Sequence, residues 1–172
     1  MRTQADTRAP LAFEAYRPVV VMRDGIVTGL MGAATIMLWF LVLDAIHGRP
    51  LYTPTVLGTV LLGVDTASLR DLPVSLPVVL FYTAVHCLAF CAVGYVAAWL
   101  FAVAEHHPPW IFGLLLFFIL FFCAFLAVPI VAKPRVFDVV TVPAILAGNF
   151  LAAVVMGGRL WRRHPLRLPQ LV

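Results

Sequence analysis

The stretch GIVTGLMGAATIMLWFLVLDAIH, residues 25–47, decides the fold of this chain. Its first nineteen residues carry no charge, and it closes on Asp44 and His47. At ~1.5 Å rise per residue, a helix of this length covers the roughly 30 Å hydrocarbon core of a bilayer. Small residues recur along it at four-residue spacing: Gly25, Gly29 and Ala33. The stretch therefore predicts a membrane-spanning helix with one face that lets another backbone approach closely.

The composition of the whole chain agrees with a membrane protein. Hydrophobic residues make up 63% of the 172 residues and charged residues 12%, against roughly 45–50% and about 25% in soluble domains. A water-soluble globule of this size has too little interior to bury so many apolar side chains. The net charge of +4 lies mostly at the two ends, so it indicates membrane topology and not a nucleic-acid partner.

Further apolar runs predict three more spans, at about 77–104, 110–132 and 138–158. Together with 25–47 they make an all-α, polytopic membrane protein with four transmembrane helices. The dipeptide Thr53-Pro54 is typical of a helix start. The apolar run after it is too short to span, so we expect a short interfacial helix near 54–64.

The later spans also carry small residues that favour close packing. The second span has Gly94, and the fourth has three at four-residue spacing: Ala144, Gly148 and Ala152. Because this spacing matches that of the first span, we expect 25–47 and 138–158 to pack together. Span 110–132 is crowded with Phe and Leu, and we expect it to face lipid or a partner most.

The distribution of Lys and Arg predicts the orientation. Four spans place the tails 1–24 and 159–172 on the same side as the 105–109 turn, with eight Lys or Arg residues there and four on the opposite side. The positive-inside rule then puts both termini in the cytoplasm. The second tail opens with a basic and aromatic group suited to anionic lipid headgroups: Arg159, Trp161, Arg162 and Arg163.

Polar residues inside the spans are the candidate functional residues. There are four: Thr35, Asp44, His86 and Asn149. All except Asp44 fall at similar depth near the midplane, where a hydrogen-bonded cluster can form if their helices touch. His86 either holds helices together through one hydrogen bond or ligates a haem, a pigment or a metal. No second histidine lies at midplane depth, so a bis-histidine haem held by this chain alone is not expected.

Two polar groups near helix ends have alternative interpretations. Asp44 and His47 lie three residues apart on one helix face, which fits an ion pair or hydrogen bond at the interface, or else a proton entry point or cation site. Glu105, His106 and His107 fit a solvated helix end. Adjacent helical histidines point about 100° apart, so they converge poorly on one metal ion.

The chain contains no phosphate-binding loop, no G-x-S-x-G, no H-E-x-x-H and no paired carboxylates within a span. We therefore expect a protein without enzymatic activity and without a required cofactor. Its expected partners are membrane lipids and other membrane protein subunits.

One segment also resembles a known group of proteins. Its residues are Gly29-Leu30-Met31-Gly32-Ala33-Ala34, Trp39-Phe40, Asp44, Gly48, Pro50-Leu51 and Thr53-Pro54. This pattern is similar to that of small, uncharacterised bacterial membrane proteins with four helices. The resemblance implies a bacterial inner membrane and no particular activity.

We therefore expect an accessory, non-catalytic subunit of a larger bacterial membrane complex, of an energy-transducing kind such as a respiratory or photosynthetic assembly. The sparse intramembrane charge and the Phe-rich span 110–132 favour this hypothesis. One alternative is a small oligomeric transporter or channel that uses Asp44, His86 and Asn149. The other is a haem- or pigment-binding membrane protein that uses His86.

Overall fold

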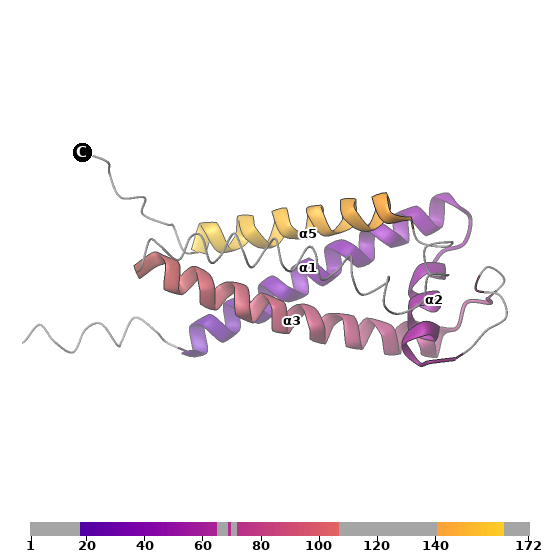
Figure 1. Ribbon diagram of the computed structural model, residues 1–172, viewed down its shortest axis with the longest axis horizontal. Coiled ribbons are helices and arrows are strands. Elements are labelled where there is room, and N and C mark those ends of the chain that lie inside the picture. Colours follow the sequence, from indigo (N-terminus) through magenta and orange to yellow (C-terminus); the bar gives the residue numbers. More distant parts are fainter. Residues whose placement is uncertain (1–17, 65–68, 70–71, 107–140, 164–172) are drawn as a thin grey trace, which may run out of the picture.

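The computed structural model describes residues 18–64, 69, 72–106 and 141–163 (Figure 1). These residues form four α-helices and no strand: α1 (Pro18–Ile46), α2 (Tyr52–Leu61), α3 (Leu76–His106) and α5 (Val142–Arg163). Helices α1, α3 and α5 are each long and apolar enough to cross a membrane. The fold is thus all-α with three candidate spans, and the predicted span 110–132 lies outside the described residues.

The long helices run beyond the predicted limits at the charged end of the bundle. Helix α1 begins at Pro18, seven residues before the predicted start at 25, and proline suits the first turn of a helix. Helix α5 begins at Val142, later than the predicted 138, and continues to Arg163. Both extensions contain charged residues, and an ion pair between Asp24 and Arg159 joins them at 3.2 Å. The predicted tails 1–24 and 159–172 therefore each contribute helical residues to the bundle.

Helix α1 is the central element, because it packs along both α3 and α5, which touch each other little. Helices α3 and α5 run in the same direction and antiparallel to α1 (Figure 1). The start of α1 and the ends of α3 and α5 thus lie at one end of the bundle. The short helix α2 lies across the other end, against α3.

The crossing of α1 and α3 depends on glycine. A Cβ atom added at Gly25 would lie 2.5 Å from the Cα of Tyr95, and one at Gly29 would meet the carbonyl of Phe90. On α3, a Cβ at Gly94 would meet the backbone of both α1 glycines. The packing face predicted on α1 therefore meets α3 at its glycines, because α3 carries the complementary gap at Gly94.

Helix α5 lies along α1 through larger side chains. The Trp39 indole covers Gly148, where an added Cβ would lie 2.8 Å from the ring, and its Nε1–H donates to the carbonyl of Ala144 at 2.9 Å. Further along, a buried apolar cluster joins all three long helices: Ala33, Ile36, Phe90, Ala152 and Met156. From the two predicted small-residue faces, Ala33 and Ala152 thus belong to one buried cluster. Gly25 and Gly29 of α1 pack against α3 instead, and an added Cβ at Gly32 would meet Met156 of α5.

Helix α2 begins differently from the sequence prediction. Its N-cap is Leu51, in the left-handed conformation with φ of 66°, and this residue makes no side-chain cap. Thr53, which the sequence places at the helix start, lies within the first turn and bonds to Asp44 of α1. At Gly58, α2 comes so close to α3 that an added Cβ would lie 2.9 Å from the carbonyl of Val78. Helix α2 is therefore fixed by its bond to α1 and by its close packing against α3.

Candidate functional site

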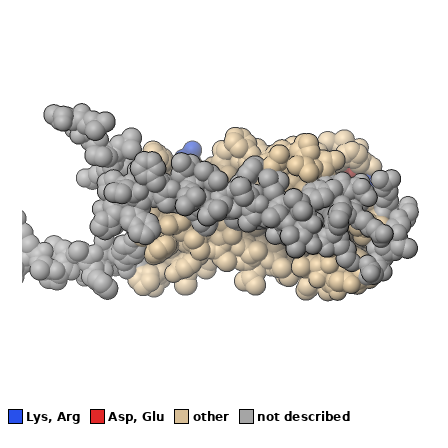
Figure 2. Space-filling model, viewed as in Figure 1, with Lys and Arg blue, Asp and Glu red and all other residues tan. Residues whose placement is uncertain are grey.

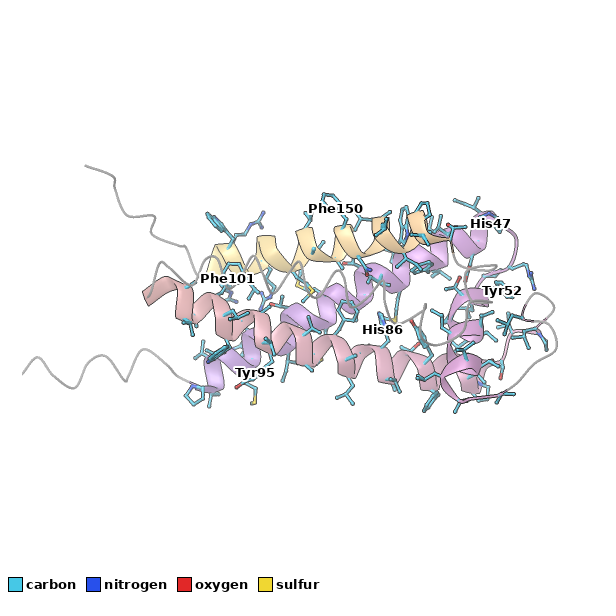
Figure 3. All side chains as sticks on the ribbon, in the orientation of Figure 1. His47, Tyr52, His86, Tyr95, Phe101 and Phe150 are labelled. Atoms are coloured by element: carbon cyan, nitrogen blue, oxygen red, sulfur yellow. The ribbon has the colours of Figure 1, made fainter. Side chains whose placement is uncertain are left out.

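His86 lies within α3 on the side toward α1 (Figure 3). Its ring is buried and lies between two aromatic neighbours of the same helix, Tyr82 with ring centroids 5.5 Å apart and Phe90 at 4.7 Å. The backbone carbonyl of Ala33 on α1 is within hydrogen-bonding reach of the imidazole. The other ring nitrogen, Nε2, is buried and has no hydrogen-bond partner in the described structure.

This arrangement determines what His86 can do chemically. A histidine that binds a metal commonly donates its other ring N–H to a backbone carbonyl, which fixes the tautomer and leaves Nε2 to the metal. Over the described ranges, no three His, Cys, Asp or Glu side chains gather as a metal site would need. The buried, unpartnered Nε2 of His86 could ligate a haem or pigment, and the described residues supply no group of three side chains that would make a metal site.

The other midplane residues do not join His86 in a hydrogen-bonded cluster. Asn149 is buried on α5, and its Nδ2 has no hydrogen-bond partner within the described part of the chain. The Thr35 hydroxyl donates to the carbonyl of Met31 in its own helix at 2.8 Å. In the described structure, the possible cluster of three is replaced by a bond of Thr35 within its own helix and by two buried nitrogens without a partner, on His86 and Asn149.

Asp44 and His47 have separate partners although they lie close in sequence. The backbone N–H of Thr53 donates to Asp44 Oδ2 at 2.7 Å, and the Thr53 hydroxyl donates to Oδ1 at 2.6 Å. The His47 ring is exposed, and its Nδ1 donates to the carbonyl of Leu43 at 2.7 Å. Asp44 thus supplies the negative charge that stabilises a helix N-terminus, in this case that of α2.

A polar cluster at the opposite end of α1 was missed by the sequence reasoning. Asp24 and Thr28 are buried there, and both bond to Arg159 of α5: Nη2 lies 3.2 Å from Asp24 Oδ1, and Nε donates to Thr28 Oγ1 at 3.1 Å. Asp24 and Arg159 fall in opposite predicted tails, 135 positions apart, and Thr28 falls in the first predicted span. The available signal in the sequence was an acidic residue at the start of the first span and a group of arginines at the end of the last.

Among the described atoms visible in Figure 2, the charged ones lie toward the two ends of the bundle. Along the body of the bundle the described atoms on that face are uncharged, as in a protein that faces lipid. The side chains of Glu105, His106 and His107 lie outside the described structure. Comparison with protein families, with curated proteins and with solved structures found no match.

Proposed function

We propose that this chain is a non-catalytic accessory subunit of a larger, energy-transducing complex in a bacterial inner membrane. The observation that carries the proposal is that both buried carboxylates of α1 are bonded to neighbouring helices. Asp24 joins α1 to α5 through Arg159, and Asp44 joins α1 to α2 through Thr53. Each of these two carboxylates thus links α1 to a neighbouring helix, which supports a structural role for both.

Tight helix contacts support the same proposal. Gly25, Gly29 and Gly94 bring α1 and α3 into backbone contact, which favours a rigid bundle over one that opens during transport. Large apolar side chains remain exposed on the outer faces of α3 and α5: Leu80, Leu88, Phe150 and Val154. These faces are available to lipid and to neighbouring subunits.

The proposal includes four spans with both termini in the cytoplasm. Helix α3 ends and α5 begins at opposite ends of the bundle (Figure 1), which supports a fourth span in the sequence between them. The end that holds the start of α1 and the end of α5 also holds Arg159, Arg162 and Arg163, in agreement with the positive-inside rule.

The test is purification from the native membrane in mild detergent, with size and visible spectrum recorded together. Co-migration with a large assembly supports the accessory role and identifies the partners. A small, colourless oligomer would contradict it and favour the transporter alternative. In that case His86→Ala should abolish flux.

A haem- or pigment-binding function is the second candidate, and the unpartnered Nε2 of His86 favours it. It predicts a coloured protein that loses its absorption bands in His86→Leu. The matched control is Asn149→Leu, which removes the other unpartnered buried nitrogen and should leave the bands unchanged. Colour that persists in His86→Leu would exclude His86 as the ligand.

A further inference from the structure

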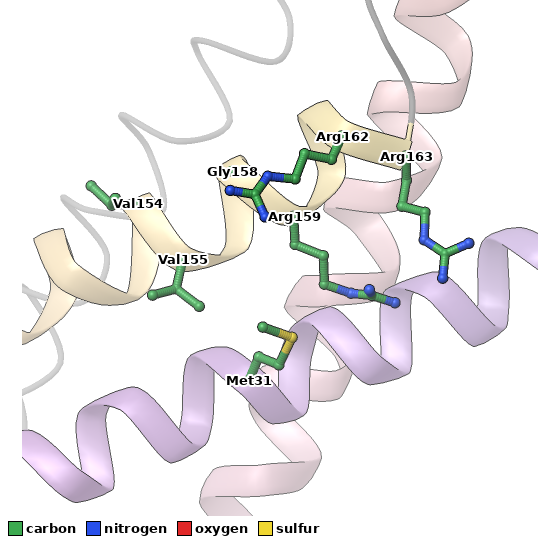
Figure 4. Close-up of a pocket in the computed structure, with 7 residues that line it drawn as sticks. All are labelled: Met31, Val154, Val155, Gly158, Arg159, Arg162 and Arg163. Carbon is green, nitrogen blue, oxygen red and sulfur yellow. The ribbon is translucent and has the colours of Figure 1, made fainter.

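A pocket of about 380 Å³ lies beside the last turns of α5, between that helix and α1 (Figure 4). One half of its lining is apolar: Met31, Val154 and Val155. The other half is cationic: Arg159, Arg162 and Arg163. Gly158 lies between the halves, and an added Cβ there would find no atom within 4 Å. The pocket therefore has a charged part, an apolar part and free space where they meet.

The cationic half keeps an excess of positive charge. Asp24 Oδ1 lies 3.2 Å from Arg159 Nη2 and 4.0 Å from Arg163 Nε. The single negative charge of Asp24 is therefore shared between two positively charged guanidinium groups. The Arg163 side chain is still 57% exposed. Arg162 is exposed, makes no ion pair with any described residue, and points back along α5 toward Gly158 (Figure 4). Arg162 and the exposed part of Arg163 can therefore bind an anion, while Asp24 and Thr28 hold Arg159 in place.

Along α5, the apolar half of the pocket comes before the cationic half, and this order matches the acyl chains and the phosphate of a phospholipid. Val155 precedes Arg159 by four residues, which is about one helical turn or roughly 5–6 Å. It lies on the side of the bilayer interior, and the arginines lie at the end of the span. A lipid phosphate lies at the membrane interface, and its acyl chains extend inward from there. A free phosphate would use the arginines and leave the apolar half empty.

We propose that this pocket binds an anionic phospholipid, with the phosphate on Arg162 and Arg163 and an acyl chain against Met31, Val154 and Val155. Arg159 is a positioning residue, because its contacts with Asp24 and Thr28 fix the turn of α5 that carries the other two arginines. The proposal is independent of the accessory role, since a transporter or pigment protein with the same pocket would bind the same lipid.

The first test is native mass spectrometry of the full-length protein with equal amounts of dioleoyl phosphatidylglycerol and dioleoyl phosphatidylcholine. We expect retention of phosphatidylglycerol, and a loss of that preference by at least about tenfold in the double variant R162Q/R163Q. R23Q is the matched control, because Arg23 is an exposed arginine at the same end of the bundle and does not line the pocket. Equal losses in R23Q and R162Q/R163Q would show general charge attraction and overturn the proposal.

A second pair of variants tests the space in the pocket without altering charge. G158L fills the pocket, and G157L is its control, because Gly157 also has no atom within 4 Å of an added Cβ and does not line the pocket. We expect G158L to displace phosphatidylglycerol and G157L to retain it. Binding unchanged by G158L would overturn the proposal.

Competition separates a lipid from a soluble anion. Inorganic phosphate added to the protein should fail to displace phosphatidylglycerol, because it has no acyl chain for the apolar half. Displacement by phosphate at concentrations similar to those of the lipid would show a site for free phosphate and overturn the assignment to a lipid.

Discussion

Each of the two buried carboxylates of α1 stabilises a different neighbouring helix. Asp44 accepts two hydrogen bonds from Thr53 near the N-terminus of α2, and Asp24 accepts from Arg159 of α5. Buried charges are costly unless they are paired or hydrogen-bonded. Their effect on stability is therefore largest when one partner is removed and the other remains.

Asp44→Asn should lower the free energy of unfolding by about 1–2 kcal/mol, since the negative charge at the start of α2 is lost. Thermal unfolding in detergent, followed by circular dichroism, measures the change. Thr53→Val removes only the hydroxyl bond and keeps the backbone bond, so it should cost less. Because the two side chains are bonded, the double variant should lose less stability than the sum of the two single losses. A loss equal to that sum would contradict the bond between Asp44 and Thr53.

Asp24→Asn should destabilise the protein by about 3 kcal/mol, because Arg159 keeps its charge in a largely buried position without its anion. The Arg159 side chain is only 17% exposed. The double variant Asp24→Asn with Arg159→Gln should recover part of the loss, since no buried charge then lacks a partner. A double variant that is less stable than either single one would contradict this account. The same unfolding assay applies.

At the scale of the helix, the α1–α3 crossing is the tightest contact described. Gly94→Ala should cost about 1–3 kcal/mol through overpacking, because the new methyl group would meet the backbone of α1. Gly157→Ala is the control: its Cβ meets nothing within 4 Å, and alanine is favoured over glycine in a helix by about 1 kcal/mol. In the unfolding assay, Gly94→Ala should therefore lower the free energy of unfolding and Gly157→Ala should raise it. Equal effects would show that helix propensity, not packing, governs position 94.

At the scale of the whole molecule, the fold predicts which ends share a side of the membrane. In a cysteine-free background, Arg163→Cys should react with a membrane-impermeant maleimide only from the cytoplasmic side, and His47→Cys only from the opposite side. Both residues are exposed at opposite ends of the bundle. Labelling of both from the same side would contradict the antiparallel placement of α1 and α5 across the bilayer.

The sequence predicted much of the fold and little of the candidate sites. Long apolar runs predicted helices where α1, α3 and α5 lie, because hydrophobic length alone determines whether a helix can span a bilayer. The ends of these helices were less predictable. Arg23 and Asp24 looked like a tail, but helix α1 includes them because Arg159 neutralises Asp24 from another helix.

The sequence by itself determined that this is an all-α protein with helices fit for a membrane, since that property depends on composition and run length. Only the tertiary structure decided which polar groups meet. Hydrogen bonds act over about 3 Å and direct ion pairs over about 4 Å. Residues as distant in sequence as Asp24 and Arg159 come this close only after the helices pack. The same packing placed Gly25 and Gly29 of α1 against α3 and Asp44 against Thr53. It left His86 Nε2 without a partner in the described structure.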